Sequence, residues 1–284
     1  ECFVAQLRLD DGGIGSWVAD RDGTGFERRT AIRFPLDDGA CPPSTRRLTI
    51  LDRPGSNALA LSRMVRLRRH DVAVVTAASP AAAWPDAAVH GNGLVVHSPQ
   101  PVRLELGLGY LPAAPREASA LMRALPGSTE LRGEEATPAN VIARAGAHDV
   151  LHFAVHGVSN RAIRAASFLL LGGELGHLEV VDILSLPLRD RRPVVVLTAC
   201  RSGAGAGNVE FDGGGLSWAF LEAGARAVVA YQDALEDEGA RVFSEAFYAA
   251  IAAGAGVSEA FERGVARVRE ARSAEAAAAF VLSI

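Results

Sequence analysis

The 284-residue chain has no lysine, few aromatic residues and only three cysteines. The cysteines, Cys2, Cys41 and Cys200, are odd in number and widely spaced, so we expect no disulfide framework and a reducing, cytoplasmic location. Aromatic residues make up 6% of the chain, and the core must therefore be built mainly from alanine, valine and leucine. All 29 basic residues are arginine, which is typical of a genome rich in G and C and indicates no function.

Two further absences restrict the partners that we expect. The net charge of -4 leaves no general basic surface, so direct binding of nucleic acid is not expected. No apolar run reaches the roughly 18 residues of a membrane-spanning helix, so no membrane partner is expected. The chain begins at Glu1 and shows no signal-peptide pattern, and we expect it to be a processed product or a fragment of a longer protein.

The order of the apolar runs predicts an α/β fold in three parts. Residues 1–45 have the pattern of short strands and turns, which indicates a strand-rich N-terminal extension. Residues 46–100 form the N-terminal part of the main domain, and within them 79–100 are rich in Ala, Pro, Gly and Asn and are expected to be a loop or linker. Residues 101–284 alternate between strand-like and helix-like patterns, which predicts a mostly parallel sheet with helices on both faces.

Individual elements follow from hydrophobic spacing and from turn residues. Residues 3–9 and 14–19 are expected to pair as a hairpin, and Thr137 with Pro138 is expected to open a helix as N-cap and first residue. Further strands are expected at 47–51, 71–76, 102–108, 150–155, 168–171, 194–198, 227–231 and 280–284. Helices are expected at 57–67, 115–125, 137–145, 180–186, 215–223, 238–253 and 257–271.

Two of these strands deliver a reactive side chain to their carboxyl ends. The apolar run 150–155 is followed by His156 and Gly157, and the run 194–198 leads to Cys200, 44 residues after the histidine (200 − 156 = 44). If the strands are adjacent and parallel, the imidazole faces the thiol and can accept its proton, which produces a nucleophilic thiolate. The backbone N–H groups of Gly157 and Cys200 can then form an oxyanion hole.

A structural interpretation of the same residues stays open. A cysteine after a valine-rich strand is usually a core residue, and a histidine at a strand end is more often a hydrogen-bonded structural group than a base. His152 lies four residues before His156, which is about 13 Å along a strand, and we interpret it as structural. No ligands with usable spacing accompany Cys200, so we expect no zinc site.

Two motifs resemble the CHAT family, bacterial relatives of caspases and separase. Val-Leu-His-Phe-Ala-Val-His-Gly (150–157) resembles the catalytic histidine motif of the family, and Val-Val-Leu-Thr-Ala-Cys-Arg-Ser-Gly (195–203) resembles its cysteine motif. The spacing of 44 residues is close to the roughly 50 residues of caspases, in which the histidine also comes first. The resemblance covers residues 46–284 and includes segments at 111–118, 133–142, 221–230, 247–248 and 278–284.

The resemblance implies a caspase-like three-layer α-β-α sandwich and cysteine endopeptidase activity without a cofactor or a metal. It implies His156 as general base and acid, Cys200 as nucleophile, the N–H groups of Gly157 and Cys200 as oxyanion donors, and a protein substrate. Two departures from the family pattern bear on the substrate pocket. The chain has Tyr231 where the family often has tryptophan, and Arg201 where many members have an acidic residue.

The acidic stretch 231–238 has two interpretations. It resembles the segment that lines the first specificity pocket of separase-like enzymes, where a carboxylate would bind an arginine at P1, the residue before the scissile bond. Asp233 is the first candidate, followed by Glu236 and Asp237, and this interpretation predicts cleavage after a basic residue. Alternatively, these acids form a polar loop that stabilises the N-terminus of the helix expected from residue 238.

The glycine-rich stretch 203–215 follows the cysteine motif directly. It is either an ordinary flexible surface loop or an activation or substrate-binding loop that becomes ordered when a partner binds, and we favour the second interpretation. No Lys-Ser/Thr pair follows the glycines, so the stretch does not match a phosphate-binding P-loop.

Three classes of function compete to explain these patterns. The resemblance implies a regulated protease of antiphage defence or programmed cell death, acting on a gasdermin-like effector or another defence protein and controlled by a regulatory domain or sensor protein. A catalytically silent caspase-like scaffold or regulatory interaction module is the alternative, although the retained His156 and Cys200 argue against it. A doubly wound nucleotide-binding domain would need a glycine fingerprint after its first strand, which the chain lacks.

Overall fold

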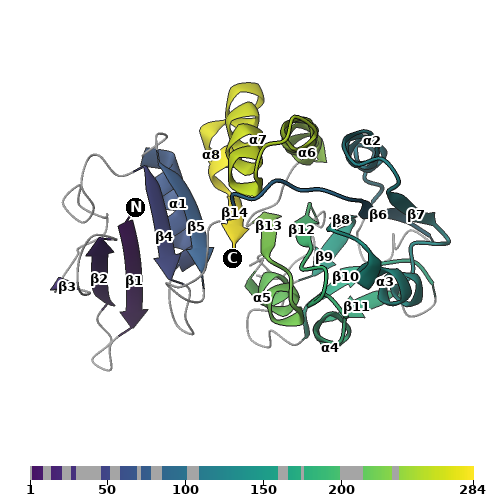
Figure 1. Ribbon diagram of the computed structural model, residues 1–284, viewed down its shortest axis with the longest axis horizontal. Coiled ribbons are helices and arrows are strands. Elements are labelled where there is room, and N and C mark those ends of the chain that lie inside the picture. The colour runs from purple at the N-terminus through teal and green to yellow at the C-terminus, as the bar shows by residue number, and fades with distance from the viewer. Residues whose placement is uncertain are drawn as a thin grey trace. The chain divides into compact units, whose positions relative to one another are not determined.

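The computed structural model describes twelve stretches of the chain, and these form two compact units (Figure 1). One unit comprises residues 1–84 together with 281–284, and the other comprises residues 85–280. The described residues are 2–8, 14–20, 27–29, 46–51, 58–68, 72–77, 85–100, 109–158, 166–173, 176–198, 214–231 and 237–284. The strand expected at 102–108 and the glycine-rich stretch up to residue 213 lie outside them.

The first unit is a mixed sheet with strand order β3-β2-β1-β4-β5-β14. Its elements are β1 (Cys2–Arg8), β2 (Ile14–Asp20), β3 (Glu27–Arg29), β4 (Arg47–Leu51), α1 (Ala58–Arg68), β5 (Ala73–Ala77) and, from residue 281, β14 (Phe280–Ser283). The pairing of β1 with β2 is antiparallel and confirms the expected hairpin. The C-terminal strand is tied to β5 by a hydrogen bond from the backbone N–H of Ile284 to the carbonyl of Thr76, at 2.8 Å.

The second unit is built on five parallel strands in the order β13-β12-β8-β6-β7. They are β6 (Gly93–Pro99), β7 (Thr129–Gly133), β8 (Val150–Ala154), β12 (Val194–Leu197) and β13 (Ala227–Tyr231). The described residues of β8, β12 and β13 are all buried, which explains their largely apolar sequences, because a strand covered on both faces has no solvent-exposed side.

The expectation of a loop over residues 79–100 is wrong for 93–99, which form β6. Leu94, Val95 and Val96 are fully buried, because β6 pairs with β8 and β7 in the interior of the sheet and helices cover both faces of that sheet. This apolar run is short and stands among alanine, proline, glycine and asparagine, so the average composition of the stretch conceals it.

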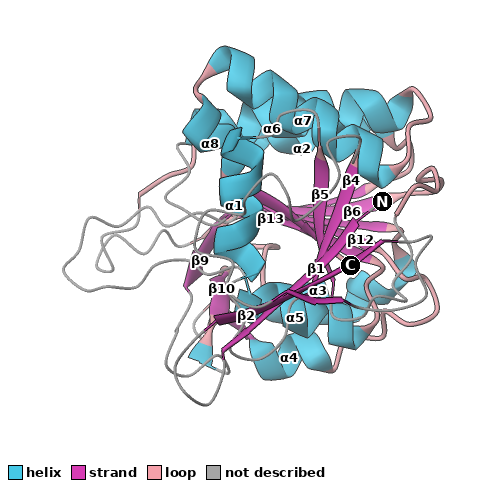
Figure 2. Cartoon of the chain, turned by 90° about the vertical axis from the view of Figure 1, so that its left-hand side faces the viewer, coloured by secondary structure: helices cyan, strands magenta, loops and turns pink. Residues whose placement is uncertain are grey.

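Helices cover both faces of this sheet, which confirms the predicted three-layer α-β-α arrangement (Figure 2). One layer contains α2 (Ala114–Ala124), α6 (Asp237–Ala252), α7 (Val257–Ala271) and α8 (Ala274–Ala278). The opposite layer contains α3 (Pro138–Arg144), α4 (Val180–Leu184) and α5 (Gly214–Ala223). The start of α3 is as predicted, since Thr137 is the N-cap and its hydroxyl accepts from the backbone N–H of Asn140.

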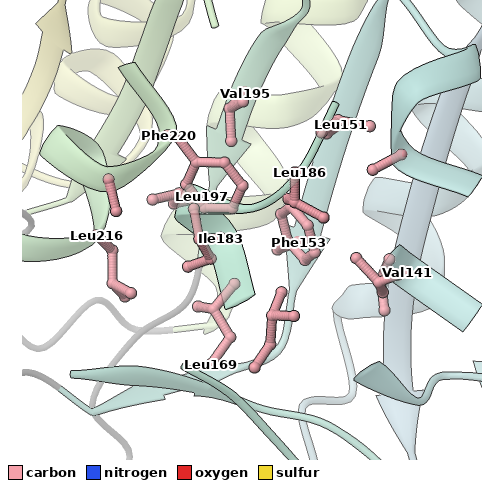
Figure 3. Close-up of a cluster of buried hydrophobic side chains, with 14 of the residues drawn as sticks. Val141, Leu151, Phe153, Leu169, Ile183, Leu186, Val195, Leu197, Leu216 and Phe220 are labelled. Carbon is pink, nitrogen blue, oxygen red and sulfur yellow. The ribbon is translucent and has the colours of Figure 1, made fainter. Parts of the chain in front are cut away.

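A hydrophobic core of the unit lies between the sheet and the layer of α3, α4 and α5 (Figure 3). Side chains alternate along each strand, so Leu151 and Phe153 of β8 both point into this cluster. Phe153 packs against Phe220 of α5, with ring centroids 5.5 Å apart. By the same alternation His152 points to the other face, toward α2 and α6, so this face of β8 carries a polar group.

A small antiparallel sheet continues from the carboxyl end of β8. It consists of β9 (His156–Val158), β10 (Phe168–Leu170) and β11 (His177–Glu179), with β10 in the middle. A bend at Val155 separates β8 from β9. His156 is therefore the first residue of a second sheet, directly beyond the edge of the large one.

Candidate active site

The carboxyl ends of β8 and β12 lie side by side at one edge of the sheet. The two strands pair in parallel from Val194 opposite Val150 to Leu197 opposite Phe153. The backbone N–H of Thr198 then donates to the carbonyl of Phe153 at 3.2 Å, which extends the pairing by one residue. Sites in open parallel sheets form at this end of the strands. Cys200, two residues after Thr198, lies outside the described residues.

His156 lies at this edge and is almost entirely buried, with 6% of its surface exposed. Its Nε2 is 2.8 Å from the carbonyl oxygen of Gly109. A carbonyl oxygen only accepts hydrogen bonds, so Nε2 carries the hydrogen in this contact and Nδ1 is the basic nitrogen of the neutral ring. The contact thus selects the tautomer in which Nδ1 can receive a proton.

The residue whose carbonyl holds His156 belongs to a short segment that leads into α2. Residues 109–113, called the strap below, connect Gly109 to Ala113, the N-cap of α2. A carboxylate oxygen of Asp237, the first residue of α6, accepts from the backbone N–H of Ala113 at 2.5 Å. The strap is therefore bonded to the histidine at one end and to α6 at the other.

Burial raises the pKa of Asp237, and this outweighs the hydrogen bond from Ala113, which lowers it. The neighbouring charges of Glu117 and Glu238 raise this pKa further, whereas His156, when it is protonated, lowers it. Asp237 thus lies in the electrostatic field of the histidine.

Behind the carboxyl ends of these strands, His152 and four other polar side chains form a buried hydrogen-bond network. Nδ1 of His152 is 2.8 Å from the hydroxyl oxygen of Tyr248, and its Nε2 is 3.3 Å from both the hydroxyl of Thr198 and a carboxylate oxygen of Glu117. The hydroxyl of Ser244 donates to the same carboxylate oxygen at 2.7 Å. Burial raises the pKa of Tyr248 well above its usual range, so the phenol stays neutral and can donate to His152.

Sequence reasoning did not identify Glu117, Ser244 or Tyr248 as members of this network. One signal was present, since Glu117 lies on the apolar face of α2, three residues after Ala114 and four before Leu121. A carboxylate on the buried face of an amphipathic helix requires a polar partner in the core.

A second polar pair lies at the end of β6. Nε2 of His97 is 2.7 Å from a carboxylate oxygen of Glu130 on β7, and Nδ1 is 3.0 Å from the hydroxyl of Ser98. Burial lowers the pKa of His97, although the contact with Glu130 acts in the opposite direction. This pair lies in the same sheet as His152 but makes no hydrogen bond to His156 that the structure records.

The other predicted site residues have different surroundings. Gly157 follows His156 in β9 and lies opposite Leu169. Asp233 and Glu236 lie outside the described residues, and Asp237 is the first residue of α6, where its carboxylate is bonded to Ala113. Within the described stretches, no group of three or more His, Cys, Asp or Glu side chains is arranged to hold a metal ion, and no helix is long and apolar enough to span a membrane.

Comparison with known proteins agrees with the fold. The family model described as the CHAT domain matches residues 49–281. Gingipain R, described as an Arg-specific cysteine proteinase, is similar over 84% of this chain and 62% of its own, with 11% identity and a TM-score of 0.51. The complex of the pro- and mature domains of Porphyromonas gingivalis RgpB is also similar. The likeness covers 84% of this chain and 64% of that one, with 10% identity and a TM-score of 0.55.

A more distant likeness is to the separase–securin complex of Saccharomyces cerevisiae, with 12% identity, a TM-score of 0.49, and coverage of 84% of this chain but 15% of that one. No curated protein matches the sequence. The chain thus spans less than two thirds of the length of the solved structures that it resembles. The match to the family model and the likeness to the two gingipain structures confirm the predicted resemblance and the caspase-like fold.

Proposed function

The chain belongs to the CHAT domain family, and from this premise we propose that it is a cysteine endopeptidase of the caspase-like clan, with His156 and Cys200 as its catalytic pair. The fold likeness to cysteine proteinases supports the class of reaction. The pair itself is supported by the strand register and by the orientation of the histidine ring.

The register is the main support for the pair. Val150 and Val194 are opposite one another and are 44 residues apart, and the same offset holds along the ladder to Phe153 and Leu197. His156 and Cys200 are separated by the same 44 residues. The last pair of this register is Phe153 with Leu197, and His156 and Cys200 each come three residues later (156 − 153 = 3; 200 − 197 = 3), so both are expected at the shared carboxyl end of the two adjacent strands.

The orientation of His156 supports its role as the base. With Nε2–H bonded to the carbonyl of Gly109, Nδ1 is the nitrogen that takes the thiol proton of Cys200. The thiolate then adds to the carbonyl carbon of the scissile peptide bond, and the resulting oxyanion accepts hydrogen bonds from the N–H groups of Gly157 and Cys200.

The remaining steps return the enzyme to its starting state. The C–N bond breaks as His156 gives its proton to the leaving amine, and the acyl group stays on Cys200 as a thioester. His156 next takes a proton from water and the hydroxide attacks the thioester; the C–S bond then breaks, the acid product leaves, and the proton passes to the departing thiolate of Cys200. The cycle consumes one water molecule and needs no cofactor.

The acidic stretch favours a basic P1 residue, with Asp233 as the first candidate to bind it and Glu236 as the second. The carboxylate of Asp237 is already engaged by Ala113, which makes it the weakest of the three candidates. Gingipain R is described as Arg-specific, and a carboxylate in this stretch would give the same preference here.

A protein of bacterial defence or cell death, such as a gasdermin-like effector, is the proposed substrate. A regulatory domain or a sensor protein is the proposed activator. Proteins encoded beside the gene are the first substrates to test, with and without the Cys200→Ala substitution.

Alkylation of the cysteines tests the catalytic pair without a known substrate. The rate of reaction with iodoacetamide is followed by peptide mass spectrometry from about pH 5 to about pH 9, which brackets the pKa near 8.5 of an ordinary thiol. We expect Cys200 to react at low pH as a thiol with a depressed pKa, and His156→Ala to return it to the ordinary profile. His90→Ala, which removes an exposed histidine, is the matched control.

A library of peptide amides with variable P1 residues tests the reaction itself. We expect cleavage after arginine, no cleavage by Cys200→Ala, and a loss of about 10²–10⁴-fold in His156→Ala. An ordinary thiol profile for Cys200 that His156→Ala leaves unchanged would refute the pair and favour the silent scaffold. Cleavage after acidic or apolar residues would refute the basic preference alone, and an unchanged preference in Asp233→Ala would assign the pocket to another residue.

A further inference from the structure

The strap holds the histidine through the backbone, so its position depends on what anchors it. At one end, the carbonyl of Gly109 accepts from Nε2 of His156 at 2.8 Å. At the other end, the N–H of Ala113 donates to Asp237 at 2.5 Å. Only three residues, 110–112, lie between these two backbone groups, so a shift of Ala113 is transmitted to Gly109 over a short length of chain.

At the end of the strap that joins α2, the N-cap residue has no side chain that could accept a hydrogen bond from the helix. Ala113 is the N-cap of α2 but has a methyl side chain, and the structure records no side-chain hydrogen bond from this cap. The N–H groups at the start of a helix have no partner within the helix, so one must come from elsewhere. Asp237 supplies it from α6, which packs beside α2 (Figure 2).

Asp237 also directly follows the stretch 232–236, which contains Asp233 and Glu236. It is thus covalently next to the proposed specificity residues and hydrogen-bonded to the segment that orients the proposed base. The groups around its carboxylate are the N–H of Ala113, the carboxylates of Glu117 and Glu238, and the charge of His156.

We propose that Asp237 is a positioning residue for His156, which acts by anchoring the strap, and that it is not part of the P1 pocket. This inference rests on the proposed function, because it concerns the residue that orients the base of that reaction. Asp237 determines where Gly109 lies, and Gly109 determines which nitrogen of His156 is available to the thiol.

Two substitutions separate the hydrogen bond from the charge. Asp237→Asn keeps an oxygen that can accept from Ala113 but has no charge, whereas Asp237→Ala removes both. We expect Asp237→Ala to lower kcat for a cleaved peptide amide by about 10- to 100-fold, the range for a base displaced by about 1 Å, with little change in KM. Asp237→Asn should stay within about threefold of the wild type, because the strap remains anchored.

The matched control is Asp182→Ala. Asp182 is also an aspartate of a first helical turn, and its carboxylate accepts from the backbone N–H of Glu179 at 3.0 Å. It belongs to α4, in the layer on the opposite face of the sheet, so its loss should leave kcat unchanged. If Asp237→Ala does not fold, Asp237→Leu replaces it, since leucine has a similar size and no acceptor.

The rate at which iodoacetamide alkylates Cys200 distinguishes positioning from a general structural role, because it depends on the orientation of His156 toward the thiol. We expect Asp237→Ala to slow the reaction at pH 6 by about tenfold, toward the rate in His156→Ala, and Asp237→Asn to leave it unchanged. If His156→Ala has no effect, the proposed catalytic pair is wrong. If His156→Ala has its effect and Asp237→Ala has none, the pair stands and the positioning role is wrong.

The P1 library separates positioning from specificity. An altered P1 preference in Asp237→Asn would return Asp237 to the substrate pocket and overturn the proposal. Equal losses of kcat in Asp237→Asn and Asp237→Ala would also overturn it, since the charge and not the anchored strap would then be responsible.

Discussion

Replacement of Tyr248 by phenylalanine removes one oxygen atom from the buried network behind the candidate site. The hydroxyl of Tyr248 lies 2.8 Å from Nδ1 of His152, and the two residues are 1% and 0% exposed. The ring keeps its packing against Phe247, at a centroid distance of 5.1 Å, so little apolar contact is lost. The cost is therefore that of a buried imidazole nitrogen left without its donor, about 1–3 kcal/mol of unfolding free energy.

Urea unfolding followed by circular dichroism measures this cost, with Tyr110→Phe as the control. Tyr110 is 71% exposed, and its variant should stay within about 0.5 kcal/mol of the wild type. A Tyr248→Phe protein that is also within about 0.5 kcal/mol would refute the hydrogen-bond assignment.

The difference in unfolding free energy between the wild type and Tyr248→Phe should also depend on pH, which tests the same hydrogen bond in a second way. Burial raises the pKa of Tyr248 well above its usual range, so above about pH 10 the unfolded chain releases this phenolic proton while the folded chain retains it. The contribution of Tyr248 to stability is thus complete below pH 10 and decreases as the pH rises further. We expect the difference between the wild type and Tyr248→Phe to narrow at alkaline pH, and a constant difference would contradict the neutral buried phenol.

The remaining predictions concern the hydrophobic core and His97, near the carboxyl end of β6. Phe220→Ala should lower the free energy of unfolding in urea by about 3–5 kcal/mol, because Phe220 is fully buried. Trp218→Ala on the same helix should lower it by about 1 kcal/mol or less, because Trp218 is 44% exposed. Equal losses in the two variants would contradict the assignment of Phe220 to the core. Burial lowers the pKa of His97, so the unfolded chain binds more protons than the folded chain below about pH 6.5 and stability falls as the pH decreases through that range. His97→Gln should flatten this dependence in urea melts from pH 7 to pH 5, and His90→Gln, which removes an exposed histidine, should not.

The sequence predicts the strands best where burial on both faces requires a continuous apolar run. The expected strand 227–231 coincides with β13, and 194–198 differs from β12 by one residue. β7 was not expected, since it is an edge strand in which only Leu131 is buried and the other residues are polar or glycine. Edge strands need few apolar residues, and their composition therefore resembles that of loops.

The candidate site is predictable only as far as side-chain chemistry is visible in the sequence. His156 is recognisable because an apolar strand precedes it. Its partner, however, is a backbone carbonyl 47 residues away, and every residue has such a carbonyl, so the sequence cannot indicate which one it is. The contact of Tyr248 with His152 spans 96 residues, and only the packing of α6 on β8 brings the two together. The position of Cys200 relative to His156 remains a prediction.

The parallel register of β8 and β12 has a consequence for relatives of this chain. His156 comes six residues after Val150, the first residue of β8, and Cys200 comes six residues after Val194, the first residue of β12 (156 − 150 = 6; 200 − 194 = 6). Insertions in the loops between the two strands change the distance along the chain from histidine to cysteine but neither of these counts. In an alignment of relatives, the interval between the two motifs is therefore free to vary, whereas the count from each strand's first residue is not.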